Sequence, residues 1–322
     1  MRFLLRRTLH STLLLFGASV LSFLLTSLAP GDFFDEMRIN PEISRETLAS
    51  LRAEYGLDRP LPVRYLQWVR SAMEGQWGFS FAYNSPAGPI LLSRSGNTLL
   101  LTGAATLLAW LIALPLGSWA AARPGSLTDR LTKGAVAVLL ATPELVLALL
   151  LLLFAVRTGY FPAGGLTAPL TSQTSFWSGA GDVLRHLFLP GICLAAGLLP
   201  LLLSHVRAAV AEALQSPCIE AARGHGIPFR RLLLRHALPL AANPLISLFG
   251  FSLGLLISSS LLVETVFSWP GLGQLMLESI GKRDLFPVMD SAVLSTAFLM
   301  AGNLAADALL YASDPRIRTA AA

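Results

Sequence analysis

Residues 219–239 read IEAARGHGIPFRRLLLRHALP and lie between two long apolar runs of the sequence. The stretch is polar and basic, and Gly226 and Pro228 interrupt it. Its alanine-rich beginning favours a helix that Gly226 is suited to end, and Pro228 is suited to begin a second helix running to about Ala237. The pattern therefore predicts two short helices joined by a sharp turn. A plain basic loop, held on the cytoplasmic side by its charge, is the alternative interpretation.

The composition is typical of a membrane protein. Of the 322 residues, 54% are hydrophobic and 13% are charged, and the mean hydropathy is +0.62. Such values indicate a chain with several membrane spans. The formal net charge of +5 does not indicate nucleic-acid binding, because the basic residues lie in short segments between apolar runs. We expect no nucleic-acid partner, and no spacing of histidines or cysteines predicts a metal or cofactor site.

Six apolar runs are long enough to cross a bilayer as helices. They cover residues 9–29, 98–122, 134–156, 187–206, 240–263 and 287–311. The first run follows a basic start and could be a signal peptide, but it is long for one, and Pro30 directly after Ala29 makes a poor cleavage site. We therefore expect an all-α polytopic membrane protein with six transmembrane helices and an uncleaved first span.

The segments between these runs define the expected organisation. The parts are residues 1–29 (cytoplasmic end and first span), 30–97 (external helical loop), 98–312 (core with the cytoplasmic loop 207–239) and 313–322 (cytoplasmic tail). Within the external loop, helical spacing of apolar residues predicts amphipathic helices over 44–55 and 63–73. Lys and Arg are roughly twice as dense in the segments assigned to the cytoplasm, which favours cytoplasmic N- and C-termini.

Glu144 is the one acidic residue deep in a predicted span, where it follows Thr142 and Pro143. A carboxylate at the centre of a bilayer costs about 2.5–3.5 kcal/mol on insertion scales, so it should face protein or water. Thr142, Pro143 and Glu144 are therefore candidates for lining a translocation path. A protonated or hydrogen-bonded packing residue explains Glu144 equally well.

Two other polar patterns within spans have structural interpretations. Residues 250–254 read GFSLG and match the nucleophile elbow of serine hydrolases, but that elbow needs a strand before it, and here the run is an apolar helix. We expect Gly250 and Gly254 to allow a close helix–helix contact instead. Asn303 and Asp307 are one turn apart on the last span and are expected to bond to a neighbouring helix.

The spacing of residues within 219–239 resembles the EAA loop of ABC importer permeases, in which this loop is the coupling helix that docks into a groove on a cytoplasmic ATPase. The resemblance is carried by Glu220, Ala221, Ala222, Gly226, Leu238 and Pro239. It implies that these residues have the coupling role. His236 is a departure, because the family's usual residue two before the Leu-Pro pair is aliphatic.

Three further motifs extend the resemblance to the dipeptide, oligopeptide and nickel permeases. They are LDRPLPVRYL at 57–66, ETVFSWPGLG at 264–273 and DPRIR at 314–318. The resemblance implies a six-helix subunit with the type I importer fold in a bacterial inner membrane. It also implies a second permease, homologous or identical, two cytoplasmic ATPase subunits and an external binding protein as partners. No GxxxxGK[ST] motif occurs, so we expect no ATPase site and no cofactor in this subunit, with ATP bound by its partners.

Two other functions fit parts of the sequence. A proton-coupled secondary transporter would use Glu144 as the carrier and predicts an inverted internal repeat, which the sequence does not show. A non-transporting membrane scaffold would need neither an ATPase nor a substrate. Within the importer interpretation, no residue of this subunit discriminates between peptides, nickel chelates and related solutes.

Overall fold

The computed structural model describes residues 2–28, 58–167 and 176–313, together with single positions between residues 31 and 56. Five helices in these ranges are long and apolar enough to cross a membrane, and one bent pair makes a sixth if it counts as one span. The five are α1 (Arg2–Leu28), α5 (Ala87–Ala122), α8 (Phe176–Leu214), α12 (Ala242–Val266) and α14 (Leu285–Ser313), and the pair is α6 (Leu127–Ala141) with α7 (Glu144–Thr158). The expected all-α architecture is confirmed.

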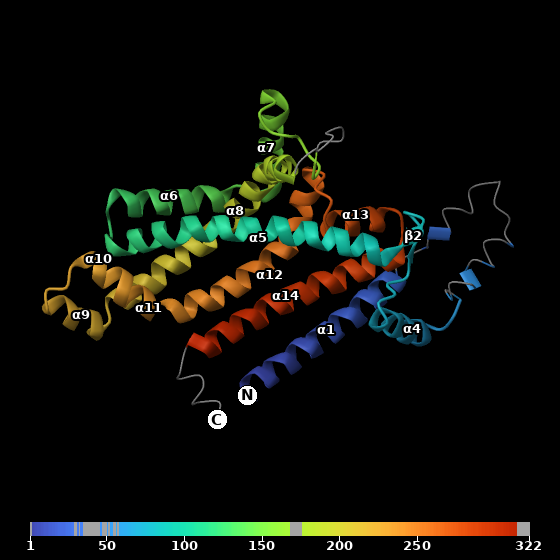
Figure 1. The fold of residues 1–322 in the computed structure, drawn as a ribbon, viewed down its shortest axis with the longest axis horizontal. Helices are drawn as coiled ribbons and strands as arrows, with labels where there is room; N and C mark the ends of the chain where they lie inside the picture. The colour runs from blue at the N-terminus through green and yellow to red at the C-terminus, as the bar shows by residue number, and fades with distance from the viewer. Residues whose placement is uncertain are drawn as a thin grey trace.

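The long helices α1, α5, α12 and α14 run side by side, and short elements lie at both ends of the bundle (Figure 1). One end, here called the α9 end, carries α9 (Pro217–Gly224), α10 (Phe229–Leu232), the π-helical turn η1 (Leu233–Ala237) and α11 (Leu238–Leu240). The other end, here called the α4 end, carries α4 (Leu61–Met73), the antiparallel pair β1 (Phe79–Ser80) and β2 (Ser85–Pro86), and α13 (Leu272–Gly281). Helix α1 begins and α14 ends towards the α9 end.

The core of the bundle lies where α5 packs along α8. Ala105, Ala109 and Ala113 recur every four residues on α5 and are fully buried in one cluster with Leu198 and Leu202 of α8. Residues spaced by four lie on one face of a helix, and small side chains there let the neighbouring backbone approach closely. The sequence of α5 therefore favours close packing against the leucines of α8.

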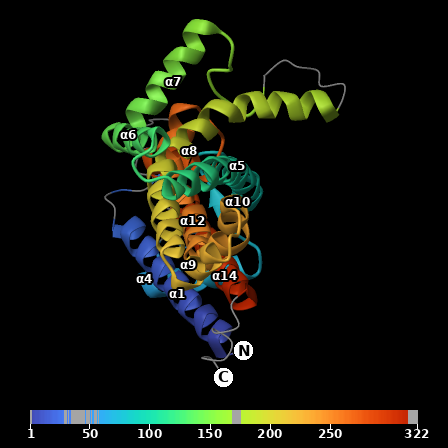
Figure 2. The ribbon, with the colours of Figure 1, turned by 90° about the vertical axis from the view of Figure 1, so that its left-hand side faces the viewer.

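The predicted span over residues 134–156 consists of two helices, which make one span only if the bent pair is counted together. Helices α6 and α7 are bent by 95° at the break between them. Thr142 has extended dihedral angles (φ −95°, ψ 112°) because the ring of Pro143 disfavours the helical conformation for the residue before it. Figure 2 shows α7 and the first part of α8 projecting away from the bundle.

The glycine pattern on α12 forms the predicted close contact with α14. A Cβ atom at Gly250 would lie 2.2 Å from the Cβ atom of Ala306, and one at Gly254 would lie 2.6 Å from a methyl carbon of Leu299. No larger residue fits either position without moving a helix. At the α9 end, Asp307 of α14 forms an ion pair with Arg7 of α1 at 3.5 Å, which confirms for Asp307 the expected bond to a neighbouring helix.

At the α4 end, side chains of α4 join it to two spans. The Nε1 atom of Trp68 donates a hydrogen bond to Asp290 of α14 at 2.9 Å, and the hydroxyl of Tyr65 lies 2.8 Å from that of Ser19 on α1. Helix α4 confirms the amphipathic helix expected over 63–73. The helix expected over 44–55 lies largely outside the described residues, as does the DPRIR motif.

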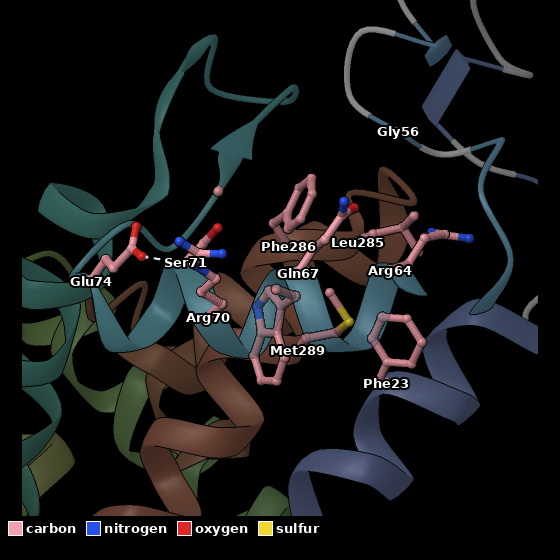
Figure 3. Close-up of a pocket in the computed structure, with 12 residues that line it drawn as sticks. Phe23, Gly56, Arg64, Gln67, Arg70, Ser71, Glu74, Leu285, Phe286 and Met289 are labelled. Atoms are coloured by element: carbon pink, nitrogen blue, oxygen red, sulfur yellow. Dashed lines mark hydrogen bonds and ion pairs between the residues drawn. The ribbon is translucent and has the colours of Figure 1, made fainter. Parts of the chain in front are cut away.

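A cavity of about 440 Å³ opens between α4 and the ends of α1 and α14. Figure 3 shows its two kinds of wall: Arg70 and Glu74 of α4 form an ion pair on one side, and Phe23 of α1 and Met289 of α14 lie on the other. The cavity belongs to the packing of the α4 end, far along the bundle from α9.

The motif that begins at Glu264 forms a buried polar junction between α12, α13 and α5. The side chain of Glu264 is fully buried. Its Oε1 atom accepts hydrogen bonds from the hydroxyls of Thr98 and Ser260, and its Oε2 atom accepts from the backbone N–H groups of Gly273 and Gln274 in the first turn of α13. A carboxylate at a helix N-terminus is stabilised by the unpaired N–H groups there, so this motif fixes α13 on the bundle.

Candidate functional site

The first helix of the candidate site is α9. Pro217 is its first residue, a position where the missing N–H group costs nothing. The helix ends at Gly224, and the chain then turns through Gly226 with φ +74°. In that turn the N–H groups of His225 and Ile227 donate to the carbonyls of Ala221 and Ala222. The predicted break at Gly226 is confirmed. The turn lies at this residue because a left-handed conformation is favourable for glycine and costly for most other residues.

The second part of the site runs from α10 to α11. The helical path predicted from Pro228 to about Ala237 is confirmed, but its second half is the π-helical turn η1. This wider turn directly precedes Pro239, which lies in α11 and cannot donate a hydrogen bond to the preceding turn. We refer to the whole path, residues 217–240, as the 217–240 segment.

One face of the 217–240 segment is anchored to the bundle. Ile219 of α9 is 1% exposed and belongs to a buried apolar cluster. The other buried members are Ala121 of α5, Val206, Val210 and Ala213 of α8, Leu232, Leu233, Ala237, Ala241 and Leu245. The segment is therefore attached to α8 and α5 through tightly packed side chains, and a displacement of α9 has to move them as well.

The residues singled out by the sequence divide between the two faces. Ala222 and Leu238 are half-buried and pack against the same apolar cluster as Ile219. Glu220, Ala221, Gly226 and Pro239 are exposed. The outer face of α9 thus combines an acidic and a small side chain, with no bulky residue between them and solvent. His236, at the position that departs from the family pattern, is half-buried, and its Nδ1 atom lies 3.4 Å from the carbonyl oxygen of Arg231.

Asp129, which the sequence analysis did not single out, joins this region to α6. Its side chain is 1% exposed and accepts hydrogen bonds from Arg207 Nε at 2.7 Å, from Lys133 Nζ at 2.9 Å and from the N–H group of Gly125 at 2.9 Å. Ser126 caps α6 by accepting from the N–H group of Asp129. The S-x-x-D spacing of 126–129 is a capping-box signal that the sequence offered.

Arg207 shows that α8 extends further than expected. The sequence placed residue 207 at the start of the cytoplasmic loop 207–239, but α8 continues to Leu214. The ion pair with Asp129 therefore holds the N-terminus of α6 against the helix that leads directly into α9.

The three path candidates lie together at the bend between α6 and α7. Thr142 follows the last residue of α6, Pro143 precedes α7, and Glu144 is the first residue of α7. The side chain of Glu144 is half-buried, and a Cβ atom at Gly197 of α8 would lie 3.8 Å from its carboxylate carbon. Glu144 is thus placed at a helix start, where the N–H groups favour a carboxylate.

The described residues contain no group of three or more His, Cys, Asp or Glu side chains that could hold a metal ion. The outer face of the 217–240 segment is exposed, and its inner face is fixed to α5 and α8, two of the helices long and apolar enough to cross a membrane.

Comparison with known proteins decides the family. The family model described as "Binding-protein-dependent transport system inner membrane component" matches residues 113–319. A second family model, which describes the N-terminal part of the membrane component of such systems, matches residues 1–95. The chain belongs to this family. It is a multi-pass inner-membrane permease subunit of an ABC importer, and this membership sets aside the proton-driven transporter and the scaffold.

Similar proteins span the whole chain. It is 35% identical over 317 residues to the oligopeptide transport system permease protein AppB of Bacillus subtilis, with 98% of each chain covered. It is 31% identical over 336 residues to the dipeptide transport system permease protein DppB of Escherichia coli, with 99% of each covered. Among solved structures, the inward-facing MetNI methionine ABC transporter matches with a TM-score of 0.55 and 22% identity, over 70% of this chain and 96% of that one. The importer permease therefore has the expected type I fold.

Proposed function

We propose that this importer permease forms the translocation path for peptides and couples to cytoplasmic ATPases through the 217–240 segment. The observation that carries the coupling role is the division of α9 into two faces. Ile219 is buried against α8, whereas Glu220 and Ala221 are exposed at the tip of the bundle. A partner can therefore bind the exposed face of α9, and a movement of the partner then acts on a helix that is packed against the spans.

The coupling follows from the packing. When ATP closes the two ATPase subunits, α9 moves with the surface on which it docks. Ile219 passes the displacement to α8 through the apolar cluster, and the Asp129–Arg207 ion pair passes it from α8 to α6. Closely packed interiors respond to such a displacement by shifting whole helices, since they have little free volume to absorb it.

The bend between α6 and α7 is the proposed part of the translocation path. Thr142, Pro143 and Glu144 interrupt a span where irregular backbone is tolerated only if protein or water covers it. Cysteine at Thr142 should react with a small thiol reagent, and a transported peptide should slow that reaction. A thiol that stays unreactive in every transport state contradicts this assignment.

The second permease subunit is proposed to pack along α7. Leu145, Leu149 and Leu153 recur every four residues on this helix and are 43%, 50% and 48% exposed. These three side chains therefore lie on one face of α7, and α7 projects from the bundle. Cysteine at Leu149 should cross-link to the second permease in the assembled transporter. Labelling of this cysteine by lipid-soluble probes alone, without cross-linking, contradicts the proposal.

The N- and C-termini are proposed to be cytoplasmic together with the α9 end, since the basic residues are dense there. The external binding protein then meets the α4 end. Peptides are the proposed substrate class because the similar proteins from Bacillus subtilis and Escherichia coli are named as oligopeptide and dipeptide permeases.

Uptake by the assembled transporter tests this proposal. The two permease subunits and the ATPases are reconstituted into proteoliposomes. The binding protein is then added with labelled dipeptides, oligopeptides or Ni²⁺. We expect peptide uptake that requires ATP and persists without a pH gradient. Uptake of Ni²⁺ without any peptide contradicts the substrate class, and uptake driven by a pH gradient without ATP contradicts the coupling.

A further inference from the structure

A second groove lies at the α9 end, on the side of the 217–240 segment that faces α5. It has a volume of about 480 Å³ and lies between the last turns of α5 and the α10–α11 path. Its lining residues are mostly apolar, and the largest exposed ones are Trp119, Phe229 and Leu234, at 43%, 41% and 62% exposure. Leu233 and Leu238 of its lining also belong to the apolar cluster that anchors the coupling segment, but the exposed residues Trp119, Arg123 and Arg230 have no part in the coupling function.

Two basic residues stand at the groove. Arg123 lies directly after the last residue of α5, with its guanidinium carbon 5.1 Å from the ring centre of Trp119. Arg230 lines the opposite wall on α10. No acidic side chain lines the groove, and within the described parts of the chain neither arginine forms an ion pair. The groove therefore carries an uncompensated positive charge beside an apolar surface.

The position of the groove along α5 limits what can occupy it. Its α5 wall runs from Leu114 to Arg123, about 13 Å along the helix at 1.5 Å per residue. Most of this wall belongs to a predicted membrane span, so a soluble ATPase that docks on α9 does not reach it. A second permease would bring its own basic cytoplasmic residues next to Arg123 and Arg230, which is unfavourable. A ligand with an anionic head and an apolar tail matches both the positive charge of the two arginines and the apolar lining of the groove.

We propose that this groove binds an anionic phospholipid. The phosphate lies between Arg123 and Arg230, the ring of Trp119 lies at the level of the headgroup, and an acyl chain follows the apolar wall towards Leu114. Basic pockets between membrane helices bind anionic headgroups, and tryptophan is enriched at this depth of the bilayer. The bound lipid would connect α5 to α10 directly beside the coupling segment.

Quenching of Trp119 fluorescence by brominated lipids tests the proposal. The full-length chain is placed in nanodiscs of phosphatidylcholine, and acyl-brominated phosphatidylglycerol or acyl-brominated phosphatidylcholine is added in increasing amounts. The signal of Trp119 is obtained by subtracting that of the Trp119→Phe variant. Nanodiscs expose both leaflets, so the result does not depend on the proposed orientation or on coupling.

We expect Trp119 to be quenched at a lower fraction of the anionic lipid than of phosphatidylcholine. Each arginine should contribute about fivefold to the relative affinity for the anionic lipid. The double variant Arg123→Gln/Arg230→Gln should lose this preference. The matched control Arg6→Gln/Arg130→Gln removes the same charge from exposed residues that do not line the groove, and it should keep the preference.

Three results would overturn the proposal. Equal quenching by the two lipids means that the groove does not select a headgroup. Equal loss in the control variant means that the general surface charge is responsible. Absence of quenching by either lipid in the assembled transporter, when measured in parallel, means that a protein subunit covers the groove.

Discussion

Replacing Gly226 should separate ATP hydrolysis from transport. The residue has φ +74°, and a Cβ atom added there would meet no atom within 4 Å. The cost of a substitution is therefore confined to the backbone, about 1–2 kcal/mol for most L-residues, less for asparagine and most for a β-branched residue. An energy of this size changes the population of the native turn by a factor of about 5–30, which is enough to disorient α9 relative to α10.

The assay measures peptide uptake and ATP hydrolysis in the same proteoliposomes. We expect Gly226→Asn to retain most of the uptake, Gly226→Ala to lose part of it and Gly226→Val to lose at least fivefold. ATP hydrolysis should fall less than uptake, and the free energy of unfolding of the permease should fall by no more than the backbone cost of about 1–2 kcal/mol. Gly75→Val is the matched control, since Gly75 has φ +80° and equally open space but lies at the α4 end.

Two outcomes contradict this reasoning. Normal uptake by the Gly226→Val variant would show that the turn does not set the position of α9. A Gly226→Asn variant as impaired as Gly226→Val would show that side-chain bulk against the partner matters, and that the left-handed backbone does not.

Three further substitutions test the packing around the site. Glu264→Ala should lower the stability by about 3–5 kcal/mol, because it leaves the hydroxyl of Thr98 and two N–H groups without their acceptor, whereas Glu264→Gln keeps one oxygen and should cost less; thermal unfolding in detergent measures both, and equal melting of the alanine variant and the parent would refute the junction. Asp129→Asn should lower the melting temperature by leaving Arg207 without its anion, and should reduce uptake per ATP hydrolysed; unchanged coupling would separate this ion pair from the mechanism. Gly250→Leu should prevent α12 from approaching Ala306 and lower the melting temperature far more than Gly103→Leu, whose added Cβ atom meets open space; similar melting of the two variants would argue against the contact.

The fold was predictable from the sequence where the signals are local. Apolar length located the spans, and the glycine at 226 located the end of α9, because a bilayer and a left-handed turn each demand a particular residue pattern. The bend of 95° at Pro143 was missed. A proline after an apolar run is compatible with a kinked span as well as with a broken one, and packing against α8 decides between them.

The candidate site was predictable where its residues belong to the local pattern, which includes the exposed outer face and the half-buried Ala222 and Leu238. The EAA-like pattern identified Glu220, Ala221 and Gly226, which are exposed and local in sequence. The anchoring contacts were not visible, since Ile219 meets residues of α5 and α8 that are far away in the chain. The same holds for the Asp129–Arg207 pair, whose partners are separated by 78 residues.

Photo-crosslinking from the outer face of α9 tests whether this helix is the element on which the ATPase docks. A photoreactive amino acid replaces Ala221 in the assembled transporter, and a second variant carries it at Leu66, which is 66% exposed on α4. Position 221 should capture an ATPase subunit, and position 66 should not. Capture of the ATPase from position 66, or of no ATPase from position 221 in a transporter that still hydrolyses ATP, would contradict the claim that α9 is the docking element.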